Sequence, residues 1–168
     1  VNSCLDSYLS SIPSSPNSDI ELRDIMKYSV LAGGKRFRPI LTYTVASLFD
    51  SKIEKADSCA CAIELIHIYS LIHDDLPAMD DDDIRHNQPT NHKVFGEAQA
   101  ILAGDGLQAL AFSIISSDPL VDADIKIKLI NLLSISSYAM AEGQSIDLSV
   151  VSKKVDLNIL KQMHQKKT

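Results

Sequence analysis

The chain has 168 residues, of which 22 are acidic and 16 are Lys or Arg, giving a formal net charge of -6. Hydrophobic residues make up 45% of the sequence and charged residues 23%, proportions typical of a folded globular protein and too apolar for a disordered one. The acidic balance and the absence of a Lys/Arg-rich run argue against a dedicated nucleic-acid-binding protein. The length predicts a single domain over residues 1–168.

The three cysteines are Cys4, Cys59 and Cys61, and they form neither a C-x-x-C pair nor the even-numbered framework of a small secreted protein. No secretory signal opens the chain, and no unbroken apolar stretch approaches the ~18 residues that indicate a membrane span. We therefore expect a cytoplasmic protein without disulfide bonds and without stable membrane insertion.

The hydrophobic pattern is helical along most of the chain. Apolar residues recur at intervals of three and four from residue 20 onward, so a first helix is expected to begin near residue 19, after a Pro/Ser/Asn-rich loop at 12–17. Pro39 precedes an apolar run at 40–49 and suits the first turn of a second helix. Further helices are expected over 56–78, 98–115, 125–140 and 157–166, with irregular connections at 80–96 and 143–154. The sequence predicts an all-α array of about six helices.

The strongest chemical signal is a run of aspartates at residues 74–83. It holds six carboxylates in ten residues, whose mutual repulsion costs stability unless a cation compensates it. Hard oxygen ligands favour Mg²⁺, which is commonly shared with substrate phosphates. For the four consecutive aspartates at 80–83 alone, a solvated acidic loop is an equally good interpretation.

Pro77 bears on which of these aspartates can share one ion. On an ideal helix Asp75 and Asp80 would lie roughly 140° apart, too far around the axis to bind the same metal. Because Pro77 lacks an amide donor, it bends or ends the helix, and the chain can return Asp80 toward Asp74 and Asp75.

Basic residues cluster at the predicted helix boundaries. In an acidic protein such clusters indicate phosphate-binding positions, since Arg forms bidentate pairs and glycine lets the backbone approach a ligand. Each of these residues alone is more simply interpreted as ordinary surface charge. They are Lys35, Arg36 and Arg38 after Gly33-Gly34, Arg85 after the aspartates, and Lys166-Lys167.

These motifs, in this order, resemble the trans-isoprenyl diphosphate synthase family. The resemblance runs from about residue 20 to the end and includes the segments 33–39, 64–80, 83–85, 89–97, 102–108, 143–148 and 164–168. It implies an all-α, isoprenoid-synthase-type helical bundle around a deep cavity, a homodimer and dependence on Mg²⁺. It also implies head-to-tail condensation of an allylic diphosphate with isopentenyl diphosphate.

The resemblance assigns roles residue by residue. Asp74, Asp75 and Asp80 would bind the Mg²⁺ that holds the allylic diphosphate, and Arg85 and Lys167 would contact that diphosphate with Thr168 beside it. Isopentenyl diphosphate would be held by Lys35, Arg38 and His67.

Product length in the family depends on the residues four and five positions before the first aspartate, here Ser70 and Tyr69. Tyr69, with the four-residue spacer 76–79, resembles the bacterial farnesyl diphosphate synthases, whereas plant-type geranylgeranyl enzymes have a smaller residue there. Farnesyl diphosphate is therefore the expected product, with geranylgeranyl diphosphate as the alternative.

Two features depart from the family pattern. His86 stands where a second arginine normally helps to bind isopentenyl diphosphate. An imidazole has a reference pKa of about 6.5 and lacks the bidentate fork, so we expect weaker binding that declines as pH rises. The second aspartate-rich motif is also absent from the 168 residues, so the domain is expected to be incomplete at the C-terminus.

Parts of the sequence also fit two other classes of protein. A His-Asp metal-dependent phosphohydrolase is suggested by His73-Asp74 with His67, but it would require histidine ligands around the metal. A non-catalytic subunit of a heteromeric prenyl synthase is suggested by His86 and the missing second motif. Such a subunit would have no need of the intact Asp74, Asp75 and Asp80.

Overall fold

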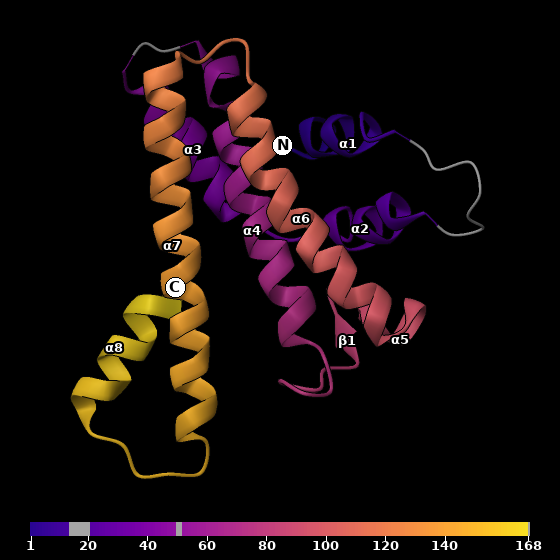
Figure 1. Ribbon diagram of the computed structural model, residues 1–168, viewed down its shortest axis with the longest axis vertical. Helices are drawn as coiled ribbons and strands as arrows, with labels where there is room; N and C mark the ends of the chain where they lie inside the picture. Colours follow the sequence, from indigo (N-terminus) through magenta and orange to yellow (C-terminus); the bar gives the residue numbers. More distant parts are fainter. Residues whose placement is uncertain (14–20, 50–51, 168) are drawn as a thin grey trace. The chain divides into compact units, whose positions relative to one another are not determined.

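The computed structural model describes residues 1–13, 21–49 and 52–167, and they form an all-α fold, as predicted (Figure 1). The helices are α1 (Asn2–Ser10), α2 (Leu22–Val30), α3 (Phe37–Ser47), α4 (Asp57–Asp74), α5 (Asn91–Phe95), α6 (Glu97–Ser117), α7 (Ala123–Val150) and α8 (Leu157–Lys167). A 3₁₀ helix, η1 (Ile53–Ala56), precedes α4, and β1 (Ile84–Arg85) pairs antiparallel with β2 (Gln88–Pro89). The chain divides into two compact units, Val1–Lys126 and Ile127–Thr168.

The core of the first unit lies between α4 and α6. Along α4 the buried positions include Ala60, Leu65, Ile68 and Ile72, which recur at helical spacing. Small residues on the facing side of α6 let the helices approach closely. A Cβ at Gly104 would lie 2.1 Å from Nε2 of His73, so a larger residue there would have to displace the His73 ring.

The end of α4 turns the chain back on itself. The helix ends at Asp74 rather than at residue 78 because Pro77 cannot continue the helical hydrogen bonds. The amide of Leu76 donates to the carbonyl of His73 at 3.2 Å, and the amide of Asp80 donates to the carbonyl of Asp74 at 2.9 Å. Asp80 is thereby returned to the C-terminal end of α4.

Several predicted boundaries were wrong. The N-terminal helix α1 was not predicted, because only Leu5 and Leu9 form its buried stripe. The connection at 80–96 contains a hairpin and α5. The predicted loop at 12–17 and the helix start near residue 19 lie mostly outside the described residues.

The second unit consists of most of α7 together with α8. We predicted a break at Gly143, but α7 runs through it. A Cβ at Gly143 would lie 2.5 Å from the backbone nitrogen of Lys167 and 2.8 Å from the carbonyl carbon of Lys166. Gly143 therefore permits the close packing of α8 on α7 and does not end the helix.

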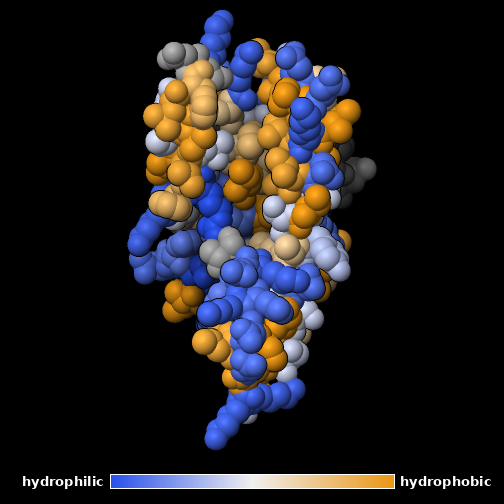
Figure 2. Space-filling view, turned by 90° about the vertical axis from the view of Figure 1, so that its left-hand side faces the viewer, coloured by the Kyte–Doolittle hydropathy of each residue, from blue (hydrophilic) through white to orange (hydrophobic). Residues whose placement is uncertain are grey.

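Hydrophobic side chains also reach the surface. Figure 2 shows them interspersed with hydrophilic ones on one face of the molecule. Phe37, Leu48 and Phe49, at the two ends of α3, are 69%, 75% and 78% exposed. Within the described part of the chain, α6 is also the helix long and apolar enough to cross a membrane by length and composition. Core helices share these properties, and α6 packs against α4 and α2.

Candidate functional site

A cavity of about 590 Å³ opens in the first unit, between the loop after α2, the start of α3, α4 and the β1–β2 hairpin. Its apolar lining includes Ile68, Leu71 and Ile72 of α4. Five residues that the sequence analysis assigned to diphosphate binding also line it: Lys35, Arg38, His67, Arg85 and His86. Residues up to 51 positions apart in the chain therefore contribute cationic and imidazole groups to one cavity.

The double glycine shapes one wall of this cavity. Gly33 and Gly34 have φ values of +111° and +113°, which side chains with a Cβ rarely adopt. Arg36, at the N-terminal end of α3, also has a positive φ of 50°. The loop can therefore turn sharply and present Lys35 and Arg38 to the cavity.

The Arg36 guanidinium forms its hydrogen bonds with other residues of the protein. Its guanidinium is buried, with Nη1 2.8 Å from Oε1 of the buried Glu64 and Nε donating to Oδ1 of Asn2 at 3.0 Å. Nη2 also donates to the carbonyl of Val30. Arg36 therefore ties the glycine loop to α1, α2 and α4, a role that the sequence analysis missed when it grouped Arg36 with the phosphate-binding residues.

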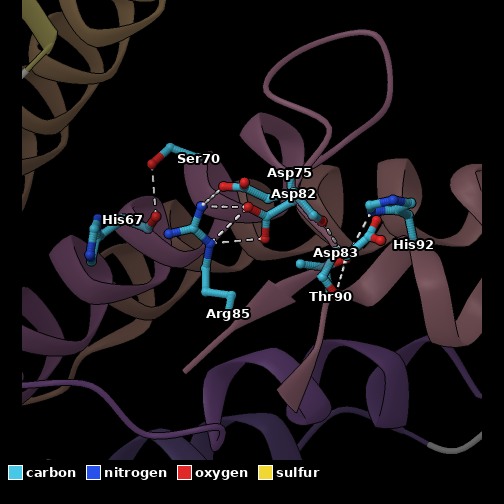
Figure 3. A network of polar contacts seen from close by, with 8 residues as sticks. All are labelled: His67, Ser70, Asp75, Asp82, Asp83, Arg85, Thr90 and His92. Carbon is cyan, nitrogen blue, oxygen red and sulfur yellow. Dashed lines mark hydrogen bonds and ion pairs between the residues drawn. The ribbon is translucent and has the colours of Figure 1, made fainter. Parts of the chain in front are cut away.

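Asp75 and Arg85 form the centre of a second network (Figure 3). Nε of Arg85 donates to Oδ1 and Oδ2 of Asp75 at 2.7 and 3.0 Å, while Nη2 lies 2.6 Å from Asp75 Oδ1 and 3.0 Å from Asp82 Oδ2. Burial raises the pKa of Asp75, and the hydrogen bonds from Arg85 oppose that rise. The Asp75 bond raises the pKa of Arg85. Asp75 thus orients Arg85 at the cavity wall.

His67 is half-buried in the same wall. Burial lowers its pKa to about 4, and the positive charge of Arg38 acts in the same direction. At neutral pH the ring is therefore uncharged and offers one N–H donor to a ligand. The Ser70 hydroxyl donates to the carbonyl of His67 at 2.8 Å within α4 (Figure 3).

This shift predicts an acid-sensitive stability. Between pH 6.5 and about 4 the unfolded chain binds a proton at His67 that the folded chain does not, so stability should fall as pH drops through this window. In His67→Gln the decrease in unfolding free energy between pH 7 and pH 4.5 should be smaller, as measured by urea unfolding. Equal decreases in both proteins would contradict this account.

The three predicted metal ligands, Asp74, Asp75 and Asp80, lie at the C-terminal end of α4 and in the turn that follows it. Both oxygens of Asp75 accept hydrogen bonds from Arg85, whereas Asp80 is joined to Asp74 through the backbone. Among the described residues, the group of three side chains close enough to share a metal ion consists of Asp81, Asp83 and His92. Their ligand atoms all lie within 4.8 Å of one another.

The two residues predicted to set product length lie on α4. The Tyr69 ring packs edge-on against His73, with ring centroids 5.1 Å apart. Neither Tyr69 nor Ser70 is among the cavity-lining residues. In the second unit, Lys167 pairs with Asp147. Thr168 lies outside the described residues.

Asn91 is a cavity-lining residue that the sequence analysis did not single out. It is buried, and its Nδ2 donates to the carbonyl of Ile25 at 3.0 Å and to Ser29 Oγ at 2.9 Å. These bonds fix the start of α5 to α2. Thr90 at the N-cap of α5, followed by Asn91 as its first residue, was the available signal, since such polar residues favour helix N-termini.

The fold and cavity thus define an all-α protein with a cationic cavity beside an aspartate-rich turn. The polyprenyl synthetase family matches residues 19–168, and the chain belongs to this family.

Individual relatives agree with this assignment. The chain is 45% identical to farnesyl diphosphate synthase of Escherichia coli over 172 aligned positions, covering 100% of this chain and 56% of that protein. It is 41% identical to the large subunit 1 of a heterodimeric geranylgeranyl pyrophosphate synthase of Arabidopsis thaliana, covering 94% of this chain and 42% of that protein. A geranyltransferase structure from Legionella pneumophila superposes with a TM-score of 0.91 at 42% identity, covering 98% of this chain and 59% of that one. The chain spans about half the length of the curated relatives it matches.

Proposed function

We propose that the protein is a trans-prenyltransferase that condenses dimethylallyl or geranyl diphosphate with isopentenyl diphosphate, head to tail, to give farnesyl diphosphate. The observation that carries this proposal is the cavity that gathers Lys35, Arg38, His67, Arg85 and His86 beside the aspartate-rich turn. Farnesyl diphosphate synthases from several bacteria are 44–47% identical to the chain, which supports the choice of activity.

The aspartate-rich turn fits a magnesium ion. The donor set consists of carboxylates, which Mg²⁺ prefers, and the Asp80–Asp74 backbone bond returns a distant carboxylate to the end of α4. We propose that Asp74, Asp75 and Asp80 hold Mg²⁺. Asp75 also accepts hydrogen bonds from Arg85, which leaves lone pairs on its carboxylate oxygens for the ion. When bound, Mg²⁺ would neutralise charge on the allylic diphosphate and stabilise the departing diphosphate.

The chain's own residues supply the remaining binding and charge stabilisation. Lys35, Arg38 and the neutral His67 donate hydrogen bonds to isopentenyl diphosphate, and Arg85 with Lys167 stabilises negative charge on the leaving diphosphate. Ile68, Leu71 and Ile72 exclude water from the allylic cation that forms when the C–O bond breaks. The released diphosphate is the proton acceptor in the final step.

The test is condensation by the purified protein. With geranyl diphosphate, isopentenyl diphosphate and Mg²⁺, we expect farnesyl diphosphate and inorganic diphosphate, and no product after chelation of the metal. If Asp74, Asp75 and Asp80 are intact but no condensation occurs with any allylic diphosphate, the proposal is wrong. We also propose that the protein is cytoplasmic and a homodimer, and light scattering of the same preparation tests the dimer.

Tyr69 is proposed to limit the product to 15 carbons. Its ring is held on α4 by the edge-on contact with His73, and a side chain of this size would block a longer prenyl chain. We expect Tyr69→Ala to shift the product toward geranylgeranyl diphosphate, measured by chromatography and mass spectrometry of the dephosphorylated products. An unchanged product distribution would remove Tyr69 from this role.

His86 is proposed to weaken the binding of isopentenyl diphosphate. It lines the cavity beside Gly34, where a guanidinium would offer two parallel donors. His86→Arg should lower KM for isopentenyl diphosphate by about tenfold, consistent with about 1.5 kcal/mol for one charge-assisted bond. KM for the allylic substrate serves as the internal control and should not change. Equal KM values for isopentenyl diphosphate in wild type and variant, at every pH, would contradict the proposal.

A further inference from the structure

Asp81, Asp83 and His92 form a cluster beside the Arg85 network (Figure 3 shows Asp83 and His92). One ligand atom from each residue lies within 4.8 Å of the other two. Around a Zn²⁺-type ion, with bonds of about 2.0–2.2 Å, ligand atoms lie roughly 3–4 Å apart, so small side-chain rotations would complete the site. The three residues come from the turn before β1 and from α5.

His92 provides an independent indication of a ligand. It is only 7% exposed, and its Nε2 is shielded from solvent without a hydrogen-bond partner among the described residues. Thr90 Oγ1 donates its single proton to the carbonyl of Asp82 at 2.8 Å, so at 3.2 Å it accepts from Nδ1–H of His92. With the proton on Nδ1, the neutral form of the ring has its electron pair on Nε2. A buried acceptor without a donor is costly, and coordination would remove this cost.

A cation already interacts with one of the two carboxylates. Nζ of Lys93 lies 2.7 Å from Oδ1 of Asp83, and both side chains are exposed enough for the lysine to move away. The ammonium group would compete with a metal ion for this oxygen. Removing Lys93 should therefore strengthen metal binding, whereas removing a ligand should weaken it.

We propose that Asp81, Asp83 and His92 bind a divalent transition-metal ion of the Zn²⁺ or Co²⁺ class, at a site separate from the carboxylate-only magnesium site of Asp74, Asp75 and Asp80. An imidazole ligand favours these ions over Mg²⁺. The ligands bracket the β1–β2 hairpin that carries Arg85 and His86, so the bound ion links both ends of that segment. The proposal does not depend on the proposed prenyltransferase activity.

The test is titration of the metal-free protein with Co²⁺, followed by visible absorption, and competition with Zn²⁺. We expect each protein chain to bind one Co²⁺ ion tightly. Zn²⁺ should displace this ion, and excess Mg²⁺ should not. His92→Gln and Asp83→Asn should weaken binding at least tenfold, and Lys93→Gln should tighten it several-fold. Asp80→Asn and His164→Gln, an exposed histidine of α8, are the controls and should bind as wild type does.

The Lys93→Gln variant keeps the test decisive if His92→Gln fails to fold, since it removes an exposed side chain. Unchanged Co²⁺ affinity in Lys93→Gln, or in a folded His92→Gln, would overturn the proposal. Loss of the tightly bound Co²⁺ ion in Asp80→Asn would also overturn it, because the ion would then belong to the magnesium site. None of these binding results depends on whether the protein condenses prenyl diphosphates.

Discussion

Replacing Arg36 by methionine should lower the free energy of unfolding by about 3–5 kcal/mol, the usual cost of breaking a buried ion pair by removing one partner. The variant leaves the Glu64 carboxylate buried without its guanidinium and removes the bonds to Asn2 and Val30. The glycine loop should also loosen, so Lys35 and Arg38 would be less well positioned in the cavity. Urea unfolding of the wild type and the variant measures the effect.

Two comparison variants make this result specific. Lys27→Met removes a more exposed pair with Asp6, 2.8 Å across, and should cost much less, because solvent screens such a pair. The double variant Arg36→Met/Glu64→Gln also removes the unpaired Glu64 carboxylate and should recover part of the lost free energy of unfolding. If Arg36→Met is no more destabilising than Lys27→Met, the Arg36–Glu64 pair does not anchor the loop.

Replacing Arg85 by methionine should lower kcat by on the order of 10²–10³, the range found when one donor to a developing negative charge is removed. Arg85 lines the cavity, and its Nε donates to both carboxylate oxygens of Asp75. The same variant removes the interaction that opposes the raised pKa of Asp75, so that pKa should rise further. Activity at low pH should therefore suffer more than activity at high pH.

Arg23→Met is the matched control for Arg85→Met. Arg23 pairs with Glu21 and Asp24, outside the cavity lining, so its loss should leave kcat unchanged. Arg85→Lys retains the charge without the fork and should recover only part of the activity. An Arg85→Met enzyme with wild-type kcat would exclude Arg85 from stabilising the leaving diphosphate.

Local pattern was sufficient to predict much of the fold. The 3–4 spacing of apolar residues predicted α4 and α6, and Pro77 predicted the turn that returns Asp80 to the end of α4. Local pattern did not predict α1, a short helix with only two buried apolar residues. It also did not predict that Gly143 lies within α7, where it allows α8 to pack closely. Tertiary contact overrides local propensity at such positions.

The candidate site was also predictable only in part. Motif order brought Lys35, Arg38, His67, Arg85 and His86 into one group, and the structure places all five around one cavity. The pairings within the site were not predictable, because they join positions far apart in the chain. Arg36 and Glu64 are 28 residues apart, and whether a cation faces a ligand or a buried carboxylate is decided by the packing of α3 on α4.

The central claim is that this cavity is the binding site of a diphosphate group. A crystal structure of the protein with isopentenyl diphosphate tests it most directly. We predict diphosphate density within hydrogen-bonding distance of Lys35, Arg38 and the His67 ring, with the prenyl carbons toward Leu71 and Ile72. Ordered diphosphate elsewhere, with this cavity holding only solvent, would contradict the account.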